Sequence, residues 1–204
     1  MRTSPFGRTA LSFGFFLLPL FCRGSHSARN QTANVTLDAS FVVVEEYAFG
    51  IQGVWVQHRE PTNCTQSPEK PRTRDITPAQ CNRTCFPGSF QPPRLSDCNK
   101  IIESLLNNNT GSLQANPHTW VYVYYESCVA VFENPDEDSP TLQYNWAVLG
   151  ANVKSLVNSC LSTPDQNSIG GACVFDEYDG KQLSNVEVAV QRFTDFDDDH
   201  DDDE

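Results

Sequence analysis

The 204-residue chain has little positive charge. Its 14 lysines and arginines stand against 26 aspartates and glutamates, so the net charge is −12. Nonspecific nucleic-acid binding needs a basic face for the phosphates, and this balance argues against that class of protein. Charged residues make up only 20% of the chain, which excludes an ion-pair-rich coiled coil. The length and the 39% hydrophobic content are sufficient for one domain with a buried core.

The usual motifs of catalytic and metal sites are also missing. Cys81 and Cys85 are not followed by a second close cysteine pair or a histidine pair, which favours disulfides over zinc. No Gly-X-Ser-X-Gly turn is present to hold a serine nucleophile, and the acidic C-terminus lacks the ligand spacing of an EF-hand. We therefore predict no catalytic residue, no bound metal and no cofactor.

Long hydrophobic runs are absent except near the N-terminus. Arg2 and Arg8 flank the start of an apolar segment at 10–22, and small residues follow at 25–27. This segment is too short to span a bilayer, and its pattern predicts a signal peptide over 1–27 that is cleaved near Ser27. We therefore expect a secreted, extracellular protein without a membrane span, whose mature charge is −15 because three arginines are lost.

Eight cysteines are many for a chain of this length, and cleavage would leave seven: Cys64, Cys81, Cys85, Cys98, Cys128, Cys160 and Cys173. In an oxidising compartment most of them should form disulfides. Because seven is odd, at least one cysteine has no partner within the chain. Three bridges among seven cysteines allow on the order of a hundred arrangements, so the sequence leaves the pairing open.

Five Asn-X-Ser/Thr triplets indicate N-glycosylation on exposed loops, at Asn30, Asn34, Asn63, Asn82 and Asn108. The polar segment 28–38 is expected to be flexible. The C-terminal segment 193–204 is expected to be a disordered acidic tail, because its last ten residues include eight acids. Between them, 39–192 reads as a single disulfide-rich domain with a proline-rich loop at 58–96.

The pattern of apolar residues predicts an α+β fold, a mostly antiparallel sheet with two helices packed on one face. Spacings of three and four residues predict one helix through Cys98, Ile101, Ile102 and Leu105, and a second through Val153, Leu156, Val157 and Cys160. Ser96 or Asp97 is expected to cap the first helix. Strands are predicted at 40–46, 51–57, 119–126, 128–132, 142–148, 172–176 and 186–190, the last two forming a hairpin around Asp179-Gly180.

Aromatic residues alternate along the strand at 119–126. Trp120, Tyr122 and Tyr124 share one face, whereas Val121, Val123 and Tyr125 share the other. Such a stripe can stack on sugars or on a partner surface, so these three residues are candidates for surface contact. The competing interpretation is that the stripe is buried beneath the N-terminal hairpin.

Residues 85–173 resemble the putative necrosis-inducing factor family, which comprises secreted, cysteine-rich, effector-like proteins of fungi. The resemblance rests on Cys85 with Phe90, on the segment 95–98, on Trp120, on Ser127-Cys128 with Phe132, and on the Gly-Gly-Ala-Cys segment 170–173. It implies secretion and, in some members of the family, action on a host or competing cell, and it implies no catalytic residue. If the four matched cysteines, Cys85, Cys98, Cys128 and Cys173, pair among themselves, Cys64 can pair with Cys81 and Cys160 is left as a free thiol.

The leading hypothesis is a secreted, non-enzymatic glycoprotein of effector-like type that binds an extracellular or cell-surface protein or carbohydrate. One alternative is a secreted hydrolase that uses a carboxylate pair, for which Glu45, Glu46 and Glu126 at strand ends are the available acids. Another alternative is a structural glycoprotein of the cell wall.

Overall fold

The computed structural model describes residues 41–62, 72–162 and 167–193. Two helices, α1 (Leu95–Asn107) and α2 (Trp146–Leu156), alternate with the strands, and a π-helical turn (Val157–Leu161) extends α2. The strands are β1 (Phe41–Ala48), β2 (Trp55–Pro61), β3 (Thr73–Asp75), β4 (Asn82–Pro87), β5 (Ser112–Ala115), β6 (Thr119–Tyr125), β7 (Cys128–Asn134), β8 (Thr141–Asn145), β9 (Ser168–Val174), β10 (Glu177–Tyr178), β11 (Lys181–Gln182) and β12 (Glu187–Arg192).

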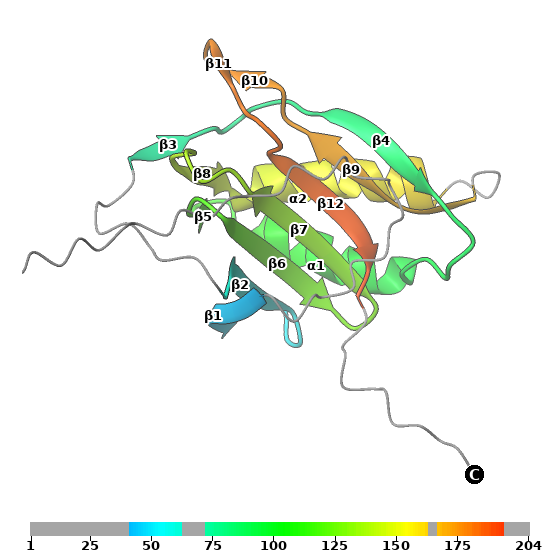
Figure 1. The fold of residues 1–204 in the computed structure, drawn as a ribbon. Coiled ribbons are helices and arrows are strands. Elements are labelled where there is room, and N and C mark those ends of the chain that lie inside the picture. Colours follow the sequence, from blue (N-terminus) through cyan, green and yellow to red (C-terminus); the bar gives the residue numbers. More distant parts are fainter. Residues whose placement is uncertain (1–40, 63–71, 163–166, 194–204) are drawn as a thin grey trace, which may run out of the picture.

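Seven of the described strands form the main sheet, in the order β1-β2-β6-β7-β12-β9-β4 (Figure 1). Every neighbouring pair in it is antiparallel. A small sheet β3-β8-β5 contains one parallel pair, β3 with β8, and β10 with β11 forms a short hairpin. The prediction of a mostly antiparallel sheet with two helices and disulfides is therefore confirmed.

The core joins both helices to alternate residues of the central strands. The predicted helix faces are buried: Cys98, Ile101, Ile102 and Leu105 in α1, and Val153, Leu156, Val157 and Cys160 in α2 and its π-helical turn. They share one cluster with Val121, Val123, Ala130, Phe132, Val188 and Val190 of the sheet. Gly150 allows α1 and α2 to approach closely, because a Cβ atom there would lie 2.8 Å from the Cβ of Leu105.

The structure corrects several predicted element boundaries. The segment 58–96 is not one continuous loop, since it contains the end of β2, then β3 and β4, and the start of α1. The strand predicted at 142–148 ends at Asn145, whose side chain accepts hydrogen bonds from the backbone N–H groups of Ala147 and Val148 and so caps α2. The hairpin turn at Asp179-Gly180 is confirmed, with positive φ angles of 50° and 69°.

Three disulfides connect the described cysteines: Cys81–Cys173, Cys85–Cys160 and Cys98–Cys128. The expectation that Cys160 is free is wrong, and so is the pairing of Cys81 with Cys64. The reason is that β4 lies antiparallel to β9, which brings Cys81 and Cys173 together. Gly171 lies opposite Cys85 and leaves room for the sulfur of Cys160. A Cβ atom at position 171 would lie only 2.8 Å from that sulfur. Cys64 lies outside the described residues.

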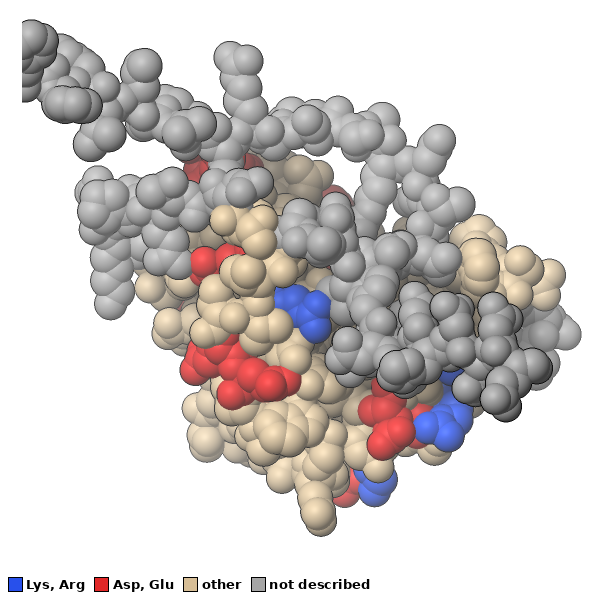
Figure 2. All heavy atoms as spheres, turned by 60° about the horizontal axis from the view of Figure 1, so that its bottom comes forward, with Lys and Arg blue, Asp and Glu red and all other residues tan. Residues whose placement is uncertain are grey.

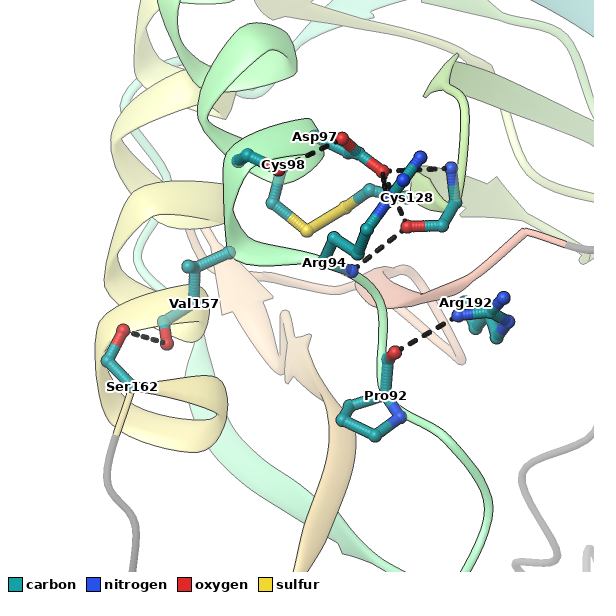
Figure 3. Close-up of a disulfide and its surroundings, with 10 residues drawn as sticks. Pro92, Arg94, Asp97, Cys98, Cys128, Val157, Ser162 and Arg192 are labelled. Atoms are coloured by element: carbon teal, nitrogen blue, oxygen red, sulfur yellow. Dashed lines mark hydrogen bonds and ion pairs between the residues drawn. A yellow bond between two sulfur atoms is a disulfide. The ribbon is translucent and has the colours of Figure 1, made fainter.

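The start of α1 is held by Asp97 rather than by a side-chain cap (Figure 3). The N-cap residue is Arg94, and its Nε donates to Asp97 Oδ2 at 2.8 Å. Ser127 donates to the same oxygen from its hydroxyl at 2.6 Å and from its backbone N–H at 3.2 Å. The prediction of a Ser96 or Asp97 cap is therefore wrong, although Asp97 does tie the first turn of α1 to the residue that precedes Cys128.

Candidate functional site

The main sheet has a second, smaller apolar cluster on the side opposite to Val121 and Val123. It consists of Tyr122, Val129 and Val131, with Trp120, Tyr124 and Phe193 packed against it. The alternation predicted for 119–126 is therefore confirmed: Val121 and Val123 join the main core, and the three aromatic residues form a separate cluster. We call the surface formed by Trp55, Trp120, Tyr122, Tyr124 and Phe193 the aromatic face.

Tyr122 lies at the centre of the aromatic face and is only 5% exposed. The guanidinium carbon of Arg59 lies 4.6 Å from the centre of its ring, which is cation–π geometry. Burial raises the pKa of Tyr122 to about 12. The prediction that Tyr122 is available for surface contact is therefore wrong, and its role is to pack beneath its neighbours.

Trp120 and Tyr124 are half-buried, at opposite ends of the stripe. The ring of Phe41 meets Trp120 edge-on, with centroids 4.8 Å apart. Phe193 stacks on Tyr124 with centroids 4.6 Å apart and an interplanar angle of 22°. Trp120 and Tyr124 thus keep part of their surface accessible while neighbouring rings hold them in place.

Trp55 is the aromatic residue that the sequence reasoning missed. It lies cross-strand from Tyr124 in β6 and from Ala48 in β1, and it is 40% exposed. Its neighbours Val54 and Val56 are fully buried in the main core. Because side chains alternate along a strand, the valines on either side of Trp55 were a signal that its ring points away from that core.

A series of hydrogen-bonded polar side chains borders the aromatic face near Trp55 and Tyr124. Tyr124 donates from its hydroxyl to Glu46 at 2.7 Å, and the side-chain amide of Gln57 donates to the same carboxylate and to the Tyr124 hydroxyl. The Gln57 carbonyl in turn accepts from Nε of the buried Arg59 at 2.9 Å. The hydrogen bonds from Gln57 and Tyr124 hold the pKa of Glu46 below its ordinary value. Fixed donors and acceptors therefore lie beside a partly exposed indole ring.

The acids of the hydrolase alternative lie on different elements and on different sides of β1. Glu45 and Glu46 are neighbours on β1, opposite His58 and Gln57 respectively, and so point to different sides of the strand. Glu126 lies in the turn between β6 and β7, where its carboxylate is 3.8 Å from Arg94. A general acid needs a raised pKa, whereas that of Glu46 is lowered.

The sequence contains four histidines, of which His58 and His118 lie within the described residues. Burial lowers the pKa of His58, which lies beside Tyr47, and His118 lies by Trp120 with ring centroids 6.2 Å apart. In the described ranges no three histidine, cysteine or acidic side chains form a group that could hold a metal. Of the glycosylation candidates, Asn82 is exposed at the start of β4 and Asn108 is half-buried after α1. Asn30, Asn34, Asn63, His200 and the segments 1–27 and 28–38 lie outside the described residues.

Comparison with known proteins found no match: no family model fits the chain, and neither a curated protein nor a solved structure is similar to it. None of the helices in 41–62, 72–162 and 167–193 has the length and apolarity required to span a membrane. The three disulfides are compatible with an extracellular protein.

Proposed function

We propose that this protein is a secreted, glycosylated, non-enzymatic binding protein of effector-like type, and that its binding surface is the exposed end of the aromatic face. We infer further that α1 and α2 cover one face of the main sheet, so that the aromatic face is the opposite one. The signal-like N-terminus, the five glycosylation triplets and the resemblance over 85–173 support this assignment.

The observation that carries the proposal is the exposure of Trp55, which lies cross-strand from Tyr124, the residue on which Phe193 stacks. The indole of Trp55 is 40% exposed, so part of its apolar surface contacts water. A ligand that covers this surface gains the free energy of burying it. Two of the neighbouring side chains, Tyr124 and Gln57, are already oriented by hydrogen bonds to Glu46. A rigid aromatic surface bordered by oriented polar groups suits a sugar ring, which stacks through its C–H face and hydrogen bonds through its hydroxyls.

Binding of the fluorescently labelled, secreted full chain to extracellular polysaccharides and to intact cells tests this proposal. Trp55→Ala should reduce binding at least tenfold, because the stacking surface is removed. Phe90→Ala is the matched control, since Phe90 is also an exposed aromatic residue, at 57%, but lies outside the aromatic face. Equal binding by the wild-type chain and Trp55→Ala would refute this surface, and turnover of a polysaccharide would refute the non-enzymatic assignment.

A further inference from the structure

The strand β1 forms one edge of the main sheet and exposes an unusually apolar segment. In Figure 1 it lies at the lower end of the sheet, and within the described residues it is hydrogen-bonded on one side only, by β2. Val42, Val43 and Val44 are 43%, 48% and 49% exposed. Three consecutive valines favour an extended backbone, and an edge strand presents unpaired N–H and C=O groups to any additional strand.

The position of these valines in the ladder makes both sides of the edge apolar. Val43 pairs with Arg59 on the side of the aromatic face, whereas Val42 pairs with Glu60 on the other side. Val44 has no partner in β2, because the register shifts between Val43 and Glu45. Such a shift is typical of a β-bulge, which leaves one residue outside the ladder. Packing among the residues that the structure describes therefore does not explain the apolar character of Val44.

The charges beside the valines determine which partner fits. Glu45 and Glu46 follow directly in β1, and both are exposed. The hydrogen bonds that lower the pKa of Glu46 keep that carboxylate charged. Figure 2 looks toward the side of the molecule where β1 and β2 lie in Figure 1, and shows acidic side chains gathered in small groups on a largely uncharged surface. A second copy of the chain is a poor occupant, because each copy is strongly acidic, with a net charge of −12 for the full sequence and −15 after loss of the predicted signal peptide.

We propose that β1 is a β-augmentation site for an extended segment of another protein, with two basic residues followed by three apolar residues. In an antiparallel arrangement the basic pair lies opposite Glu46 and Glu45, and the apolar residues lie opposite Val44, Val43 and Val42. The backbone hydrogen bonds of the edge hold the segment, and the cross-strand pairs select its sequence. This site borders the sugar-binding surface proposed at Trp55 and shares Glu46 with it, but it does not use Trp55.

Fluorescence anisotropy with a labelled synthetic peptide, in which two lysines precede three valines, tests the site on the secreted full chain. A second peptide with two glutamates in place of the lysines should bind at least tenfold more weakly. Glu45→Lys should reduce this preference, because one of the two negative charges becomes positive, and Val44→Lys should weaken binding of the lysine peptide by placing a positive charge on the edge. Leu106→Lys is the control, because Leu106 is an exposed apolar residue of α1, away from the edge.

Several outcomes would overturn this site: no binding of the lysine peptide, an unchanged preference in Glu45→Lys, or equal binding by Val44→Lys and Leu106→Lys. A dimer of the wild-type chain that Val44→Lys dissociates would show that the occupant is a second copy instead. Trp55→Ala separates the two proposals, since it should abolish polysaccharide binding and leave peptide binding unchanged.

Discussion

Asp97 shows how a single carboxylate can stabilise the junction between a helix and a sheet. Burial works to raise its pKa, but hydrogen bonds from Ser127, Arg94 and Ser96 outweigh that effect, and the pKa of Asp97 lies below its ordinary value. Nothing in the local sequence reveals this network, because Ser127 is 30 residues away in the turn before β7. The local sequence offered only a helix-cap motif at Ser96 and Asp97, and this motif predicted the wrong hydrogen bonds.

Replacing Asp97 with Asn should destabilise the protein by about 2 kcal/mol at neutral pH, since hydrogen bonds to a buried charge are weakened. The pKa of Asp97 is lower in the folded chain than in the unfolded one, so its stabilising effect is present above about pH 4 and is lost as the pH falls through the folded value. Urea unfolding of both chains between pH 7 and pH 2 measures this.

The difference in unfolding free energy between wild type and Asp97→Asn should therefore shrink on acidification below about pH 4. Glu103→Gln serves as the control, because Glu103 is an exposed acid of the same helix. A difference that stays constant to pH 2 would contradict the assigned role of the charge.

At the scale of elements, alternation and helical spacing identified most of the strands and both helices. These patterns failed for elements whose formation depends on residues in another part of the chain. The strands β3 and β4 have few apolar residues, and they form because β8 and β9 offer them hydrogen-bonding edges. The boundary between β8 and α2 depends on the capping side chain of Asn145, which interrupts an otherwise continuous apolar segment.

The disulfide Cys85–Cys160 ties the π-helical turn after α2 to the edge strand β4, and Gly171 provides its space. The double variant Cys85→Ala/Cys160→Ala should lose about 4 kcal/mol of stability, because the bridge closes a loop of 75 residues. Thermal unfolding compared with Asn158→Ala, an exposed position of the same turn that leaves the bridge intact, measures this loss. Equal unfolding temperatures for the two variants would show that the bridge does not stabilise the fold.

Gly171→Ala gives a milder change at the same element. The added methyl group would lie 2.8 Å from the Cys160 sulfur and 2.9 Å from the backbone oxygen of Thr84. We expect a loss of about 1–3 kcal/mol, as is typical of overpacking, with the disulfide still formed. Peptide mapping checks that the disulfide forms, and urea unfolding measures the loss of stability. Unchanged stability would contradict the close approach of Gly171 to Cys160 and Thr84.

At the scale of the whole molecule, the three disulfides show how the six described cysteines are paired. Each of the six described cysteines is bonded to another of the six, so Cys64 is the remaining cysteine if the proposed signal peptide, which contains Cys22, is removed. Alkylation of the non-reduced, secreted protein should modify Cys64 alone or reveal a disulfide-linked dimer through it. Modification of Cys160 under the same conditions would contradict the observed pairing.

The class of fold, the expectation of disulfides and the alternation that places Trp120, Tyr122 and Tyr124 on one side of β6 could all be predicted from the sequence. These properties follow from composition and from periods of two and 3.6 residues, which each segment carries within itself. Tertiary structure alone decided which cysteines pair, that Tyr122 is buried beneath Arg59, and that Trp55 and Val42–Val44 remain exposed. The physical reason is that disulfides and burial depend on which strands are neighbours, and strand order is set by packing over the entire chain.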